Sequence, residues 1–379
     1  MFRLATLTAA LPVSAAVAPA GAGHLNVLFI VSDDLRPEMG CYGGQAITPH
    51  LDKFAASAGA VLFERSYVQQ AICCPTRSSF LTGRRPDATK VWDLHTHFRA
   101  SGGREWKTLP EFFKDNGYFT AGMGKVFHPV KDPATGQAND VGFSWTAPYF
   151  SSGPSAPQSM AMCWNERGNG THDAPCTGGP HSCTADGTIA AHGVALLQNA
   201  SNYPDVPFFI AVGIHRPHLP WDVPAHWYSL YPAAEDIALA DHNTPPADYG
   251  PARNYSWDPQ SGYASASSRH HHTRPVPRDH ENLRTKCVIP PARSPRHCGP
   301  LRALSDPEDP KMGEFALVPD DVARNFRRGY FAAVSATDHN AGQVLDALAA
   351  LKLEDKTVTI FLGDHGVRDH AAPMHLSFG

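Results

Sequence analysis

The chain has 379 residues, of which 42% are hydrophobic and 18% are charged, and its formal net charge is −4. This is the composition of an ordinary globular protein, long enough for one large α/β domain or two small ones. It shows neither the basic excess that nucleic-acid binding needs nor a charge run that would form a tail, so we expect no nucleic-acid partner.

The N-terminus predicts export. Met-Phe-Arg supplies one positive charge, an apolar run follows, and small residues at Ala18 and Ala20 suit a signal peptidase. We therefore expect a signal peptide over residues 1–22 and a secreted or lysosomal location, or a periplasmic one in a bacterium. No later segment has the roughly 18 consecutive apolar residues of a membrane span, so none is expected.

Two apolar patterns alternate along the chain. Short runs that are apolar on both faces are typical of buried parallel strands, and runs at helical spacing predict helices. The expected strands are 25–31, 118–122, 207–213 and 356–362, and the expected helices are 48–59, 108–117 and about 320–351. This alternation predicts an α/β fold, with a central, mostly parallel sheet and helices on both of its faces.

Two stretches interrupt the alternation. Residues 131–187 are rich in Gly, Pro, Ser and Cys, and residues 240–312 are rich in Pro, Arg and His, so both are expected to be insertions or long loops. Candidate disulfides are Cys163–Cys176 and Cys287–Cys298, although the sequence alone does not fix their connectivity. Acceptor triplets for N-glycosylation begin at Asn169, Asn199 and Asn254.

The most informative motif is residues 71–83, Ala-Ile-Cys-Cys-Pro-Thr-Arg-Ser-Ser-Phe-Leu-Thr-Gly. Pro75 suits the first turn of a helix, where its missing N–H costs nothing. Cys73 then lies at the positive end of that helix, which favours an anion. Arg77 falls one turn later on the same face, so its guanidinium can reach back to Cys73 or to a bound anion. Two adjacent cysteines alone would fit a helix start with buried thiols, but six specified positions in one window favour a reactive site.

Acidic residues follow the first and the last expected strands. Asp33 and Asp34 come directly after the first, and Asp364 with His365 after the last. Because ligands bind at the carboxyl ends of parallel strands, these side chains are expected to converge there. Oxygen-rich ligation by three aspartates favours a hard cation, calcium or else magnesium. Each pair taken separately could instead cap a helix.

Further candidates follow the other strands. The segment 117–128, Gly-Tyr-Phe-Thr-Ala-Gly-Met-Gly-Lys-Val-Phe-His, places Lys125 and His128 after one strand. His215 follows the next strand in Gly-Ile-His-Arg-Pro-His, and an exposed histidine at a strand end can serve as a general acid.

These motifs together resemble the type I sulfatases of the alkaline phosphatase superfamily. The Cys-x-Pro-x-Arg run resembles the defining motif of that family, and the segment around Lys125 resembles its second signature. The stretches at 33–37, 81–87, 124–129, 214–220 and 364–366 are similar to the iduronate-2-sulfatase branch. The Asp-His pair at residues 364 and 365 favours that branch over the arylsulfatases, which usually have Asp-Asn. The resemblance covers about residues 24–366 and is poor over 240–312.

The resemblance implies an alkaline-phosphatase-like sandwich and a sulfuric ester hydrolase that acts on a sulfated uronic acid or glycosaminoglycan-type glycan. Cys73 would be oxidised to formylglycine by a formylglycine-generating enzyme, and its hydrated aldehyde would attack sulfur. The family's metal ligands fall on Asp33, Asp34, the modified Cys73, Asp364 and His365. Its catalytic contacts fall on Arg77, Lys125, His128 and His215. The domain organisation implied is a catalytic N-terminal domain at 23–366.

The chain departs from the family pattern after residue 366. The sulfate-contacting lysine and the smaller C-terminal subdomain of the family are not found there, and residues 367–379 form a divergent tail. One alternative is therefore a truncated, inactive protein that binds a sulfated glycan or a metal. A second is a phosphatase or phosphodiesterase of the same superfamily, against which the Cys-x-Pro-x-Arg context counts because those enzymes use Ser or Thr.

Overall fold

The computed structural model describes residues 23–151, 165–167, 184–219, 221–239, 255–257, 264–266 and 320–366. The predicted signal peptide, the tail 367–379, both candidate disulfides, Asn169, Asn254 and most of 240–312 lie outside the described residues. In the described part, no helix is both long and apolar enough to cross a bilayer.

A four-stranded sheet organises the described residues. Its strands are β1 (Asn26–Asp33), β2 (Phe119–Gly124), β4 (Phe208–Pro217) and β8 (Thr357–Gly363), in the order β2-β4-β1-β8. Every neighbouring pair is parallel. The shorter strands are β3 (Asn165–Arg167) with β5 (Asp222–Pro224), and β6 (Tyr255–Trp257) with β7 (Ala264–Ala266).

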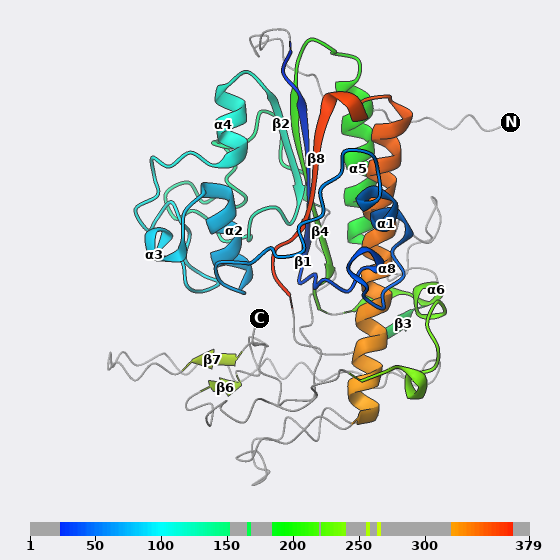
Figure 1. The fold of residues 1–379 in the computed structure, drawn as a ribbon. Helices are drawn as coiled ribbons and strands as arrows, with labels where there is room; N and C mark the ends of the chain where they lie inside the picture. Colours follow the sequence, from blue (N-terminus) through cyan, green and yellow to red (C-terminus); the bar gives the residue numbers. More distant parts are fainter. Residues whose placement is uncertain are drawn as a thin grey trace, which may run out of the picture.

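Helices cover both faces of this sheet (Figure 1). The larger ones are α1 (Pro49–Ala55), α2 (Cys73–Thr82), α4 (Leu109–Asp115), α5 (Ala185–Ala200) and α8 (Asp320–Ala350). The short ones are α3 (Pro86–Thr89) and α6 (Ala225–Tyr228), with 3-10 turns at Gly40–Tyr42, Ala234–Asp236 and Glu354–Lys356. Helices α5 and α8 pack on one face, and α2 and α4 lie on the other.

The alternation of side chains in β1 explains these two layers. Leu28 and Ile30 belong to the apolar cluster that includes α5 and α8 residues, whereas Phe29 and Val31 belong to the cluster on the α2 side. Because both faces of the strand are buried, the run is apolar at every position, as expected for a central parallel strand. The expected α/β fold with a parallel sheet is confirmed.

Most elements lie where the sequence predicts them, but α1 ends at Ala55 rather than at residue 59, and β1 includes Asp33, which was expected to follow it. The difference at β4 affects the site most. The strand was expected over 207–213 but extends from Phe208 to Pro217, so that His215 lies inside it. The polar pair His-Arg at residues 215 and 216 predicts the start of a loop, yet the backbone stays extended there. The first residue after this strand is therefore His218.

Helix α8 also fixes the turn that follows β1. The buried hydroxyl of Tyr330 donates to the carbonyl of Asp34 (2.8 Å) and accepts from the backbone N–H of Arg36 (2.8 Å). Asp34 has φ of 63°, in the left-handed region that few non-glycine residues adopt. The clamp by Tyr330 thus holds an unfavourable backbone conformation in place.

Tyr330→Phe removes the hydroxyl and leaves one buried and one partly buried backbone group without their partner. We expect the free energy of unfolding to fall by about 1–3 kcal/mol, seen as a lower urea midpoint with an unchanged m-value. Tyr203→Phe is the matched control, because the Tyr203 ring is 41% exposed. Equal midpoints for the two variants would contradict the clamp.

Candidate active site

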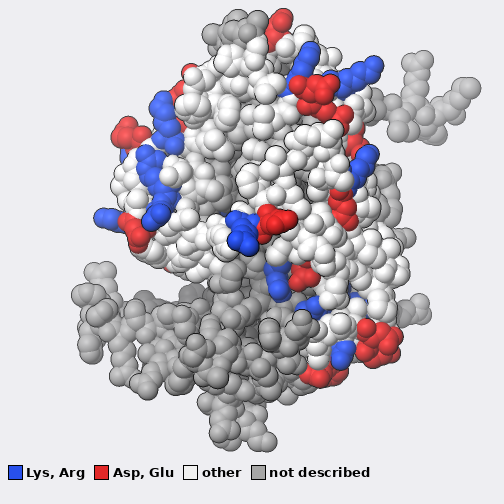
Figure 2. All heavy atoms as spheres, in the orientation of Figure 1, with Lys and Arg blue, Asp and Glu red and all other residues white. Residues whose placement is uncertain are grey.

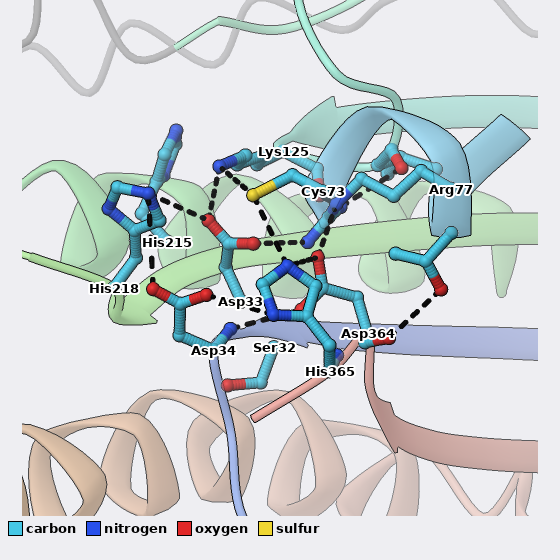
Figure 3. A network of polar contacts seen from close by, with 12 residues as sticks. Ser32, Asp33, Asp34, Cys73, Arg77, Lys125, His215, His218, Asp364 and His365 are labelled. Atoms are coloured by element: carbon cyan, nitrogen blue, oxygen red, sulfur yellow. Dashed lines mark hydrogen bonds and ion pairs between the residues drawn. The ribbon is translucent and has the colours of Figure 1, made fainter. Parts of the chain in front are cut away.

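The carboxyl ends of the four parallel strands converge on one cluster of polar side chains (Figure 3). β1 supplies Asp33 and Asp34, β8 leads to Asp364 and His365, β2 to Lys125, and β4 to His218. The backbone N–H of Asp364 donates to Ser32 O (3.0 Å), and that of Asp34 to Asp364 Oδ1 (3.0 Å). The expected convergence of the two acidic pairs is therefore present.

Helix α2 places Cys73 in this cluster. Cys73 is the first helical residue, and its Sγ lies 3.6 Å from Lys125 Nζ and 3.3 Å from His365 Nε2. Thr76 Oγ1 donates to the carbonyl of Asp364 (3.0 Å), which ties the first turn of the helix to the end of β8. The motif thus brings the thiol to the positive end of the helix, next to the acidic residues.

Arg77 has a different set of partners from the expected one. Its Nε donates to Asp364 Oδ2 (2.8 Å), and its Nη2 donates to Asp33 Oδ1 (3.2 Å). Its Nη1 donates to the carbonyls of Lys125 and Val126. The fully buried guanidinium therefore holds the ends of β1, β2 and β8 together instead of reaching back to Cys73.

Two glycines allow Lys125 to come close to Asp33. Gly124 has φ of 67°, and a Cβ there would lie 2.0 Å from the carbonyl oxygen of Gly213. A Cβ on Gly213 would lie 2.2 Å from the carbonyl carbon of Lys125. Only glycine at both positions permits this approach of β2 and β4. Lys125 Nζ then forms an ion pair with Asp33 Oδ2.

The three carboxylates differ in their electrostatics. Burial would raise the pKa of Asp33, but Lys125, His218 and Arg77 together hold it well below its usual range. Burial, with the charges of Asp33 and Asp364, raises the pKa of Asp34 well above its ordinary value. Burial also raises the pKa of Asp364 to about 8, against the effect of Arg77. The cluster thus holds more acidic groups than its own cations neutralise.

A cation fits this donor set. One ligand atom from each of Asp33, Cys73, Asp364 and His365 lies within 4.8 Å of the others, and all four residues are buried. Asp34 Oδ1 is buried and makes no hydrogen bond, although His365 Nδ1 is 3.2 Å away. Burial lowers the pKa of His365 to about 4, so its ring is neutral and can offer a lone pair. Carboxylate oxygens in this number suit a hard divalent ion.

The Cys73 thiol is not an activated nucleophile in this setting. Burial raises its pKa well above the ordinary value, and Asp33 adds to that effect while Lys125 opposes it. A thiol with a raised pKa stays protonated near neutral pH and reacts slowly.

His218, rather than His215, faces the acidic residues. Its Nε2 is 3.9 Å from Asp33 Oδ2 and 3.9 Å from Asp34 Oδ2. The His215 ring is directed away from the cluster and pairs with Asp186, with 3.0 Å between Nδ1 and Oδ1. Sequence reasoning missed His218, although it stands three residues after His215 in the same segment, because the strand was expected to end earlier.

His128 lies next to the cluster but has different neighbours from the other site residues. It lines a small cavity with Cys74, His97 and Phe98, and its buried Nδ1 has no hydrogen-bond partner. Burial lowers the pKa of His128 to about 3, and the charge of Lys125 adds to this effect. The ring is therefore neutral.

The charged groups of the site are buried, and the visible surface has no comparable concentration of one sign. Figure 2 shows acidic and basic side chains interspersed over the described surface on this face.

Known proteins with similar sequences are sulfatases. The iduronate 2-sulfatase of Mus musculus is 32% identical over 363 residues, which is 93% of this chain and 56% of that protein. The iduronate 2-sulfatase of Homo sapiens is 32% identical over 347 residues, 90% of this chain and 54% of the human protein. The chain spans about half the length of these curated relatives.

Solved structures show the same fold. One is a protein solved in complex with its substrate D-glucosamine-2-N,6-O-disulfate. It has a TM-score of 0.59 and 20% identity to this chain, and the match covers 94% of this chain and 68% of that protein. Another is a phosphonate monoester hydrolase from Silicibacter pomeroyi, with a TM-score of 0.58 and 19% identity, covering 94% and 65%. These likenesses confirm the expected alkaline-phosphatase-like α/β fold.

The family description that matches this chain is "Sulfatase", over residues 25–373. That range contains the motif at Cys73, both acidic pairs, Lys125, His215 and His218. The chain therefore belongs to the sulfatase family.

Proposed function

We propose that the protein hydrolyses sulfate esters on a sulfated uronic acid or a related glycosaminoglycan-type glycan. The observation that carries this proposal is the buried cluster in which Cys73 lies between Lys125 and His365, next to Asp33 and Asp364. The glycan class is supported by the 32% identity to iduronate 2-sulfatases. Residues 23–366 would be the catalytic domain of an exported, secreted or lysosomal protein, or of a periplasmic one in a bacterium.

The nucleophile would come from Cys73 after oxidation to formylglycine by a formylglycine-generating enzyme. The raised pKa of the Cys73 thiol supports this, because the unmodified side chain is a poor nucleophile in its buried site. The hydrated aldehyde supplies an oxygen nucleophile at the position of Sγ.

A divalent cation, calcium or else magnesium, would be held by Asp33, Asp34, Asp364, His365 and the modified Cys73. When bound, it supplies Lewis-acid stabilisation of charge on the transferring group. The surplus of carboxylates and the unbonded Asp34 Oδ1 support a cation at this position. Arg77 keeps Asp33 and Asp364 in place for it through two ion pairs.

Lys125 and His218 would act on the ester. Lys125 Nζ, 3.6 Å from Cys73 Sγ, can donate to sulfate oxygens as negative charge develops there. His218 Nδ1 lies 2.6 Å from Leu219 O, so Nδ1 carries a hydrogen and Nε2 is the nitrogen that gains or loses a proton. Burial lowers the pKa of His218 to about 3, and the charge of Lys125 adds to this effect, so the ring is neutral beside its present neighbours. A proton-donating role therefore requires that the negative charge of a bound ester raise this pKa. With that requirement, protonation of the leaving alcohol is assigned to His218 Nε2, with His215 as the other candidate. His128 would accept a proton from the nucleophilic residue when sulfate is released.

A second candidate function is hydrolysis of phosphonate or phosphate monoesters. The structural likeness to a phosphonate monoester hydrolase favours it. Assaying the same preparation on 4-nitrophenyl sulfate and on 4-nitrophenyl phenylphosphonate separates the two candidate functions. For a sulfatase, turnover of the sulfate should exceed turnover of the phosphonate. Binding of a sulfated glycan without turnover of any ester would favour a non-catalytic binding protein instead.

Cys73→Ser should abolish turnover of a fluorogenic uronate 2-sulfate by protein made in a eukaryotic secretory host, where the modifying enzyme acts on cysteine. Cys74→Ala should keep appreciable activity, because the Cys74 thiol donates to the carbonyl of Thr96 (3.4 Å) and belongs to the apolar cluster on the α2 side. Equal losses from the two substitutions would contradict the assignment of Cys73.

Asp34→Asn should lower the bound calcium or magnesium per protein, because the amide keeps the size of the side chain but removes its charge from the donor set. Asp236→Asn, in an exposed turn, should leave the metal content unchanged. Elemental analysis after gel filtration measures both. Undiminished metal in the Asp34 variant would rule out its role as a ligand.

A further inference from the structure

The pairing of β1 with β4 has an irregularity next to the site. Ser32 pairs with Ile214, but the next residue, Asp33, pairs with Pro217. His215 and Arg216 therefore lie outside the ladder, as the extra residues of a β-bulge. Such a bulge leaves backbone N–H groups unpaired and changes the direction of the side chains that follow.

The buried carboxylate of Asp186 accepts hydrogen bonds from the backbone N–H groups that the bulge leaves unpaired. Its Oδ1 accepts from the backbone N–H of His215 (2.8 Å), and its Oδ2 from that of Arg216 (2.9 Å). Asp186 is 4% exposed and comes from the first turn of α5. Burial alone would raise the pKa of Asp186, but the hydrogen bonds and charges of this segment lower it, so the group stays ionised.

The opposite side of the bulge is fixed from β1. Ser32 Oγ donates to the carbonyl of Arg216 (2.7 Å), so that both the N–H and the C=O of Arg216 are bound. His215 adds a third bond to Asp186 through its ring. The segment is therefore held by one side chain from α5 and one from β1.

The bulge determines where His218 lies. By bringing Pro217 opposite Asp33, it places the next residue beside both acidic side chains, with His218 Nε2 3.9 Å from each (Figure 3). In a regular ladder, Asp33 would instead face His215. The order of the two histidines at the site thus depends on the stability of the bulge.

We propose that Asp186 is a positioning residue, whose carboxylate holds the bulge at His215 and Arg216 so that His218 faces the reacting ester. This inference rests on the proposed sulfatase function. Asp186 itself contacts neither the acidic cluster nor Cys73, and it acts through the backbone.

The first test compares leaving groups. An alkyl sulfate needs a proton on its leaving oxygen, whereas 4-nitrophenyl sulfate leaves as a stable anion, so loss of a general acid should affect only the first strongly. His218→Ala should lower kcat for the alkyl ester roughly 10²–10⁴-fold more than for the aryl ester. Asp186→Ala should show the same selective loss, on the order of a hundredfold. Asp186→Asn keeps one acceptor oxygen, so its selective loss of kcat on the alkyl ester should be smaller than that of Asp186→Ala.

The control is Asp338→Asn. Asp338 is also buried and also accepts two backbone N–H groups, those of His50 (3.2 Å) and Leu51 (2.7 Å), but it lies between α8 and α1. Its substitution should lower stability without any dependence on the leaving group. Hydrogen–deuterium exchange gives a second readout that needs no activity: the amides of residues 215 and 216 should exchange faster in both Asp186 variants than in wild type and in the control.

The outcomes separate the two proposals. If the wild-type protein hydrolyses neither ester, the proposed function fails. Faster exchange at residues 215 and 216 in the Asp186 variants would still support the role of Asp186 in holding the bulge. If the wild type is active and Asp186→Asn loses both esters equally with unchanged exchange, the positioning role is wrong. A selective loss on the alkyl ester in His215→Ala, but not in His218→Ala, would overturn the role given to His218.

Discussion

Repulsion among three buried carboxylates is the constraint on which the site depends. Asp33, Asp34 and Asp364 meet because adjacent parallel strands end together, and burial makes each negative charge costly. Arg77 and Lys125 neutralise Asp33, but the pKa values of Asp34 and Asp364 stay raised. A cation in this position would balance the remaining negative charge.

Rigid elements hold the cluster in place. Helix α2 begins at Cys73, the glycine pair at 124 and 213 lets Lys125 approach, and Tyr330 clamps the turn at Asp34. Each device comes from a different part of the chain, and each is buried. Packing against two apolar layers limits the movement of the strand ends, so the geometry is set before any ligand arrives.

The sequence was sufficient for the sheet, the layers and most of the cluster. Two-sided apolar runs identified β1, β4 and β8, and polar residues directly after them identified the acidic pairs. It was insufficient where the backbone departs from a regular ladder. The polar residues His215 and Arg216 do not read as strand, and the bulge that contains them depends on Asp186, which is 29 residues away from His215. The partners of Arg77 were likewise hidden, because they come from β1, β2 and β8.

The central claim is that Cys73 becomes the nucleophilic residue of a cation-assisted sulfatase site. Mass spectrometry of the tryptic peptide 66–77, from protein purified out of its secretory pathway, tests it most directly. The account predicts that residue 73 carries an aldehyde, which a hydroxylamine probe labels, while Cys74 remains an alkylatable thiol. An active protein in which both residues are unmodified cysteines would contradict it.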